Sequence, residues 1–311
     1  MVVSLRGGLM SSSSRLAGIL AMVLSMGLFI ASDSASKFAF DQVPVFQVVM
    51  LRALAAAILC TVIILALGQG GALAHAFNPW ALARGLCEVG ANLGFTLAIL
   101  RLPIADVTAI AQTAPLLVLL GASLIWGERI GPLRLVLIGI GVTGALLVAQ
   151  PGTTAFSPYA LLGFVVAACA ATRDLLTRKV PPHVPAPVVA LSVLLILTIA
   201  GTLGMVAFET PVMPDATSAA LLVTAGALMV GGHVGVFLAY KLAPARSVAP
   251  FMYALTLWAV LASIVLFGEW PNGLAVIGMI LVVSAGLLAI AHDEVALRSV
   301  RAVEGGKSDA A

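Results

Sequence analysis

The sequence predicts an all-α integral membrane protein whose ten transmembrane helices form two inverted five-helix repeats. Three observations support this fold class. The chain of 311 residues is 61% hydrophobic and only 9% charged, whereas soluble domains have about 25% charged residues. Ten apolar segments each have the roughly 20 residues that a helix needs to cross a bilayer. A constant shift of 141 positions relates the first five segments to the last five.

The ten apolar segments are separated by short connections. Gly, Pro, Asn and Asp mark these connections as turns, and none is long enough for a separate soluble domain. The first segment is longer than the apolar core of about 7–15 residues in a cleavable signal peptide, so we expect it to be a true span. The predicted spans are 16–37, 43–67, 77–99, 104–126, 131–150, 159–178, 187–208, 218–240, 247–268 and 272–291.

An even number of spans places both termini on one side of the membrane. Eleven basic residues fall on that side, and only Lys37 and Arg101 fall on the other. The positive-inside rule therefore predicts that both termini are cytoplasmic. The predicted organisation is a tail over 1–15, a first repeat over 16–150, an inverted second repeat over 151–291 and a tail over 292–311.

The internal repeat matches residues that stand out from the apolar background. The matched pairs include Asp33 with Asp174, Lys37 with Arg178, Pro103 with Pro244, Gly90 with Gly231 and Gly94 with Gly235. Because five is odd, the second copy enters the membrane in the opposite orientation. Inverted repeats are typical of secondary transporters, which bind substrate near the bilayer midplane where the repeats meet.

Residues 84–95, RGLCEVGANLGF, place Arg84, Glu88 and Asn92 on one face of a predicted transmembrane helix. A charge at the bilayer centre costs about 2.5–3.5 kcal/mol on insertion scales, so these side chains are expected to face protein or water. In one interpretation Glu88 binds a substrate amine or a proton, and Arg84 holds its charge or takes a carboxylate. In the other, an internal ion pair ties this helix to the preceding one through Arg52.

The repeat also predicts the residues of a central cavity. Asn92 corresponds to His233, and Gln112 corresponds to Tyr253, so each half has hydrogen-bonding side chains at matching depths. These side chains either line a solute pathway or form hydrogen bonds between helices. Thr256 lies one turn from Tyr253 and belongs to the same predicted wall.

Two further groups of residues have alternative roles. Asp33 with Lys37 and Asp174 with Arg178 are i,i+4 pairs at opposite membrane faces, and they either gate the pathway or anchor their helices. Trp258 lies in the middle of a span, and it either stacks on a substrate or packs between helices.

The sequence contains no pattern typical of a metal, cofactor or catalytic site, so we expect none. The three cysteines lie in apolar runs and are typical of small hydrophobic side chains. Histidine and cysteine do not occur together at the spacing of metal ligands. The motifs of intramembrane proteases are also missing from the apolar runs, so we expect no enzyme.

Two stretches resemble a known family. SKFAFDQVPVFQVVMLR (36–52) is similar to the first two helices of the drug/metabolite transporter superfamily, and residues 101–144 are similar to its fourth and fifth helices. The resemblance extends from about 16 to 291 and is closest to the ten-helix EamA-type exporters. In the second half, FGEW lacks the Arg after Glu. The matching elements of 101–144 are Pro103, Pro115, Gly127-Glu128-Arg129, Gly139 and Gly144.

This resemblance implies a secondary transporter of the bacterial inner membrane that works by alternating access. It implies export of small amphipathic metabolites, amino acids first, because polar groups in an apolar cavity suit a zwitterion with a hydrophobic side chain. The alternative is efflux of lipophilic cations, with Glu88 as the counter-charge. The expected partners are a small-molecule substrate and membrane lipid, with no nucleic acid and no obligate protein partner.

Overall fold

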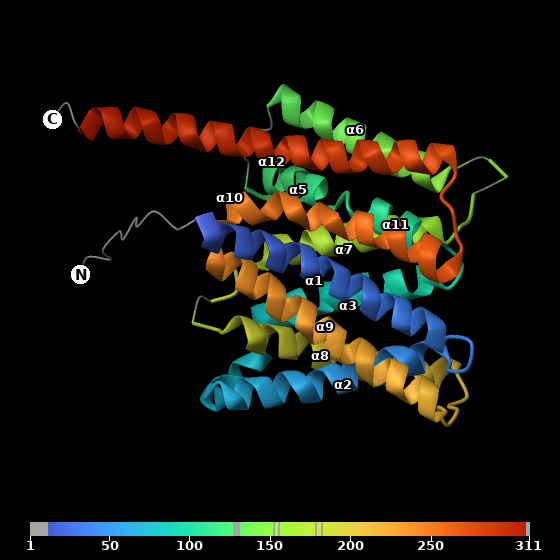
Figure 1. The fold of residues 1–311 in the computed structure, drawn as a ribbon. Coiled ribbons are helices and arrows are strands. Elements are labelled where there is room, and N and C mark those ends of the chain that lie inside the picture. The colour runs from blue at the N-terminus through green and yellow to red at the C-terminus, as the bar shows by residue number, and fades with distance from the viewer. Residues whose placement is uncertain are drawn as a thin grey trace.

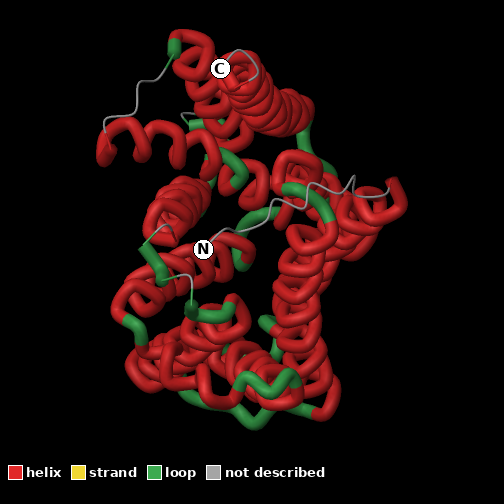
Figure 2. The backbone as a smooth tube through the Cα atoms, turned by 90° about the vertical axis from the view of Figure 1, so that its left-hand side faces the viewer, coloured by secondary structure: helices red, strands yellow, loops and turns green. Residues whose placement is uncertain are grey.

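The computed structural model describes residues 12–126, 131–151, 153–154, 156–177, 179–181 and 183–308. In this part of the chain every regular element is helical, as Figure 2 shows. The long helices lie side by side with nearly parallel axes, and α1 begins at the end of the bundle where α12 finishes (Figure 1). The elements are α1 (Ser12–Ala39), α2 (Val45–Ala66), η1 (Gly70–Phe77), α3 (Pro79–Ile99), α4 (Ile104–Ala111), α5 (Ala114–Trp126), α6 (Pro132–Ala149), α7 (Ala160–Thr177), α8 (Ala186–Phe208), α9 (Ala216–Leu242), α10 (Ala245–Val248), η2 (Ala249–Tyr253), α11 (Ala254–Phe267) and α12 (Gly273–Ser308).

Local sequence signals explain where the helices begin. The side chain of Asn78 accepts hydrogen bonds from the first backbone N–H groups of α3, and Pro79 occupies the first helical position. Asp215 caps α9 by accepting from the backbone N–H of Ser218 at 2.7 Å. Pro44 and Pro185 immediately precede α2 and α8, where their fixed φ suits a helix start.

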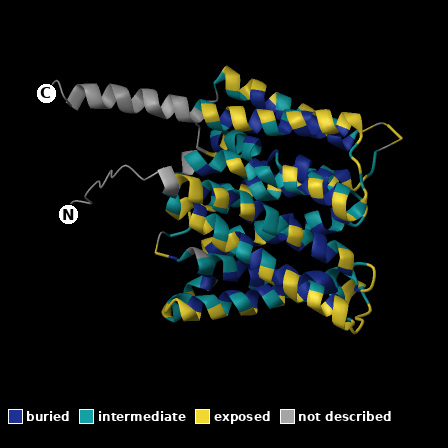
Figure 3. Ribbon diagram, viewed as in Figure 1, coloured by how far each residue is buried: buried dark blue, intermediate teal, exposed yellow. Residues whose placement is uncertain are grey.

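The chain is a multi-pass membrane protein. Nine helical segments of the described residues are long and apolar enough to cross a membrane. The helix α3 has 21 residues but is not among these nine, because it carries the polar face of Arg84, Glu88 and Asn92. Large apolar side chains are exposed on the outward faces of the bundle (Figure 3), as expected for surfaces that meet lipid.

The helix boundaries of the two halves correspond. The first residues of α2, α4 and α6 each lie 141 positions before the first residues of α8, α10 and α12. The last residue of α5 lies 141 positions before the last residue of α11. The shift that relates the sequences therefore also relates the positions at which the helices start and stop.

The main helix pairings join one half of the chain to the other. They are α1 with α9, α3 with α7, α2 with α8 and α6 with α12. At the crossing of α6 and α12, a side chain on Gly278 would lie 2.4 Å from the carbonyl oxygen of Gly144, so the backbones touch. Neither half therefore forms its core alone.

Matched glycines allow the α1–α9 and α3–α7 pairs to approach in the same way. On α3, Gly94 faces Val166 of α7. On α9, the corresponding Gly235 faces Ser25 of α1, and Ser25 corresponds to Val166 under the shift of 141 positions. Small residues let transmembrane helices pack closely. The shift of 141 positions therefore relates these two contacts as well as the helix boundaries.

Candidate functional site

Two predicted spans are broken in the structure at corresponding positions. The predicted span 104–126 consists of α4 and α5, and the predicted span 247–268 consists of α10, η2 and α11. Pro115 has no N–H to donate to the carbonyl of Ala111, and Pro250 lies in the second interruption. Non-helical backbone at membrane depth is tolerated only inside protein or beside a water-filled cavity.

A hydrogen bond from the predicted site residue Gln112 joins the two breaks. The side chain of Gln112, which ends α4, donates a hydrogen bond to the carbonyl oxygen of Met252 at 3.3 Å. Under the shift, Gln112 corresponds to Tyr253, so the bond joins neighbouring positions of the two breaks. The hydroxyls of Thr108, Tyr253 and Thr256 nearby are buried without a hydrogen-bond partner.

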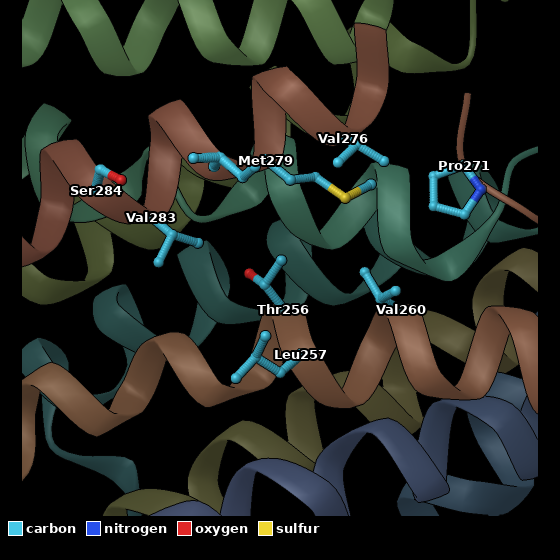
Figure 4. Close-up of a pocket in the computed structure, with 9 residues that line it drawn as sticks. Thr256, Leu257, Val260, Pro271, Val276, Met279, Val283 and Ser284 are labelled. Carbon is cyan, nitrogen blue, oxygen red and sulfur yellow. The ribbon is translucent and has the colours of Figure 1, made fainter. Parts of the chain in front are cut away.

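The predicted residues Tyr253 and Thr256 point to different places. The hydroxyl of Tyr253 occupies the space that a side chain on Gly286 of α12 would fill, so it packs between helices. Thr256 lines an apolar pocket of about 290 Å³ between α11 and α12, opposite Met279 (Figure 4). Trp258 donates from Nε1 to the carbonyl of Val23 at 2.9 Å, which supports its packing role.

Arg52 forms the centre of a buried polar cluster. Its side chain is 2% exposed. It donates to Asp33 Oδ1 at 2.8 Å, to Ser36 Oγ at 3.1 Å and to Asn92 Oδ1 at 2.9 Å. The predicted Asp33–Lys37 pair is therefore wrong, because the buried guanidinium engages Asp33 from α2. Arg52 does tie α2 to α3, but through Asn92 and not through Glu88.

Lys37 pairs with a residue far away in sequence. Its ammonium lies 2.9 Å from Glu269 Oε1 and 3.1 Å from Oε2, and it also donates to the carbonyl oxygen of Leu102 at 3.3 Å. It lies 4.6 Å from the ring centroid of Phe267. This salt bridge joins the end of α1 to the segment after α11.

A second charged cluster surrounds Glu88. Arg173 of α7 donates to both carboxylate oxygens of Glu88, at 3.0 and 3.1 Å, and its Nε donates to Asp174 at 2.8 Å. Arg84 lies 3.6 Å from Glu88 Oε2 and donates to Thr177 Oγ1 at 3.1 Å. The predicted partner of Asp174, Arg178, lies outside the described residues. Among the described residues, Asp174 pairs with its neighbour Arg173.

The helix α3 connects the two clusters. Glu88 and Asn92 are four residues apart and lie on one face of α3, so the Glu88 cluster and the Arg52 cluster are one turn apart. The side chains of Asp33, Arg84, Glu88 and Arg173 remain 19–23% exposed although they lie within helices. Charged groups inside a membrane face protein or water and not lipid.

His233 does not repeat the contacts of Asn92. Its side chain is exposed, its Nδ1 lies 2.8 Å from the carbonyl oxygen of Met229, and its ring packs edge-on against Phe29 at 5.0 Å. The matched positions thus carry polar groups with different partners.

The comparisons with known proteins agree with this arrangement. The model of the EamA-like transporter family matches residues 16–150. This segment is therefore similar to the EamA-like transporter family. A solved crystal structure has the same fold as this chain, with a TM-score of 0.60 and 22% identity over 90% of this chain and 96% of the other.

Three relatives of this chain have transporter names. A riboflavin transporter of Rhizobium johnstonii is 31% identical over 61% of this chain. A pseudopaline exporter of Pseudomonas aeruginosa is 30% identical over 52%, and an S-adenosylmethionine uptake transporter of Rickettsia prowazekii is 24% identical over 91%. The alignments span 63%, 57% and 95% of these relatives' own lengths. The family and these relatives are transporters by name, in agreement with the prediction that the chain is no enzyme.

The residues predicted from the sequence leave out three charged residues of the candidate site. They are Arg173, Glu269 and Asp106. All three share a signal, since each is a charge within or next to a predicted apolar span. Their partners lie in other helices, and a single sequence does not reveal those pairings.

Proposed function

We propose that this chain is a secondary transporter that moves small amphipathic metabolites across the bacterial inner membrane by alternating access. In this proposal 16–150 and 151–291 are inverted five-helix repeats, α3 supplies the tenth span, and the tails 1–15 and 292–311 are cytoplasmic. The excess of basic residues on the terminal side supports this orientation. Corresponding helix boundaries and pairings between the halves support the repeats.

The observation that carries the proposal is the meeting of two helix breaks. Transporters with inverted repeats place their substrate where discontinuous helices of the two repeats face each other. Here the α4–α5 break and the η2–α11 break are joined by the hydrogen bond from Gln112 to the Met252 carbonyl. Unpartnered hydroxyls of Thr108 and Thr256 nearby give a substrate hydrogen-bonding groups.

The charged clusters favour a substrate that carries both signs of charge. In the Glu88 cluster two arginines and two carboxylates neutralise one another. A zwitterion offers a carboxylate to Arg84 or Arg173 and an amine to Glu88, so it replaces these pairs without leaving an unpaired charge. A lipophilic cation needs a free counter-charge, whereas both oxygens of Glu88 already accept from Arg173. We therefore propose amino acids as the first substrate class and export as the direction.

The relatives widen the set of compounds to be tested. Their names include riboflavin, pseudopaline and S-adenosylmethionine, and both an exporter and an uptake transporter occur among them. Radiolabelled amino acids, riboflavin and S-adenosylmethionine should be offered to proteoliposomes that contain the purified chain. Counterflow exchange measures transport without a driving gradient, so it detects export and uptake alike.

The decisive variant is Gln112→Ala, with Gln42→Ala as the matched control. Gln42 is exposed in the loop after α1, far in sequence from either break. We expect counterflow of at least one compound in the wild type, a loss of about tenfold in Gln112→Ala and no loss in the control. Wild-type counterflow in Gln112→Ala would refute the site at the breaks. Failure of wild-type protein to exchange any of the three classes would refute the proposed substrates.

A further inference from the structure

Asp106 is a half-buried acid at the end of the bundle where Lys37 and Glu269 pair. It lies in the first turn of α4, and its Oδ1 atom is buried without a hydrogen-bond partner among the described residues. Glu269 and Lys37 interact with it electrostatically. A buried carboxylate oxygen without a hydrogen bond is costly unless the group takes up a proton or gains a cation. This acid is used by neither of the two clusters described above.

The surrounding contacts hold Asp106 beside the salt bridge. Lys37 donates to the carbonyl oxygen of Leu102, four residues before Asp106. The backbone N–H of Ala105 donates to Ser263 Oγ on α11 at 3.1 Å, which docks the first turn of α4 against the helix that leads to Glu269. Both carboxylates are therefore held near one ammonium group.

The other helices packed against α4 bring no further charge to this end. They are α3, α6, α7, α11 and α12. The charged residues within α3, α6, α7 and α12 lie nearer the opposite end, and α11 has none. Arg101, which follows α3, is exposed. Among the described residues, the local balance is thus two acids for the half-buried cation Lys37.

We propose that Asp106 binds the proton through which pH controls the Lys37–Glu269 salt bridge. When Asp106 carries a proton, Lys37 interacts fully with Glu269, and α1 stays joined to the segment after α11. When the proton leaves, the new carboxylate repels Glu269 and competes for Lys37, so the junction weakens. The link to transport is the one step that rests on the proposed function: in a transporter, proton binding at Asp106 would change which end of the pathway is open.

Infrared spectroscopy of the purified protein in lipid nanodiscs tests the proton site without any transported compound. We expect an absorption band of a buried protonated carboxyl group that disappears as pH rises. The band should be missing from Asp106→Asn and unchanged in Asp41→Asn, whose side chain is exposed at the same end. Persistence of the band in Asp106→Asn, or its absence from wild type at every pH, would overturn the proposal.

A second variant separates a proton site from a merely structural acid. In Glu269→Gln the repelling carboxylate is removed and Lys37 becomes free to attract Asp106. The band should then disappear at a pH lower by about one unit, which is a tenfold change in proton affinity. An unmoved transition would refute the coupling. If the chain exchanged none of the tested compounds, the proposed transport function would be refuted. The infrared band would still test whether Asp106 binds a proton.

Discussion

Replacement of Arg52 by methionine tests the buried cluster between α1, α2 and α3. The variant keeps an unbranched side chain but removes the guanidinium, so Asp33 and Asn92 lose the donor that Arg52 provides. Removal of one partner of a buried ion pair costs about 3–5 kcal/mol. Because the Asp33 side chain is 21% exposed and water reaches it, we expect the lower limit, about 3 kcal/mol. At about 2–4 °C per kcal/mol, the melting temperature should fall by about 6–12 °C.

Thermal unfolding in detergent, followed by near-ultraviolet circular dichroism, measures this effect. Arg101→Met is the control, because Arg101 is exposed and its loss should change stability by less than about 0.5 kcal/mol. The double variant Asp33→Asn/Arg52→Met should recover part of the loss, since it buries no unpaired charge. A melting temperature of Arg52→Met equal to that of the control would refute the reasoning.

Four further perturbations have defined outcomes. Gly278→Val forces a side chain against the carbonyl of Gly144 and should cost about 1–3 kcal/mol in thermal unfolding. Trp258→Phe loses the hydrogen bond to α1 and should cost about 1 kcal/mol by the same measurement. The backbone N–H of Ser218 at the start of α9 holds the pKa of Asp215 below its usual range. The charged cap therefore stabilises α9 at neutral pH, and this contribution is lost as pH falls through the lowered pKa. Asp215→Asn should reduce the loss of melting temperature in acid. Glu88→Gln should cut counterflow about tenfold or more while folded protein stays abundant in gel filtration, and undiminished exchange would count against the pathway along α3.

The fold class can be predicted because an apolar segment of membrane-spanning length is recognised from neighbouring residues alone. Nine apolar segments of the described residues coincide with helices of membrane-spanning length. The shift of 141 positions, which predicted the repeat, also matches the starts of α2 and α8. The predicted spans contain no interruption at α4–α5 or η2–α11, because the average over each span stays apolar. Hydropathy is insensitive to the path of the backbone, and the two polar residues Gln112 and Thr113 of the first break do not change that average enough to divide the span.

The site was predicted in its residue types but not in its pairings. The prediction that Arg84, Glu88 and Asn92 share a face follows from helix geometry alone. The partners of Glu88 and Lys37 lie 85 and 232 residues away, and no rule of local spacing connects them. For Asp33, the i,i+4 rule selects a neighbour on its own helix, whereas the structure pairs Asp33 with the buried guanidinium of Arg52 on α2.

The pairing of Glu88 with Arg173 also has a consequence for synthesis of the chain. At about 5–20 residues per second, a ribosome needs roughly 4–17 s to make the next 85 residues. During that interval α3 reaches the membrane before α7 exists, and Glu88 lacks its final partner. Arg84, one turn away, is already made and lies 3.6 Å from Glu88 in the finished structure. Under the proposed topology, in which α3 is the tenth span, Arg84 supplies a provisional counter-charge for the insertion of α3 before the second half is made.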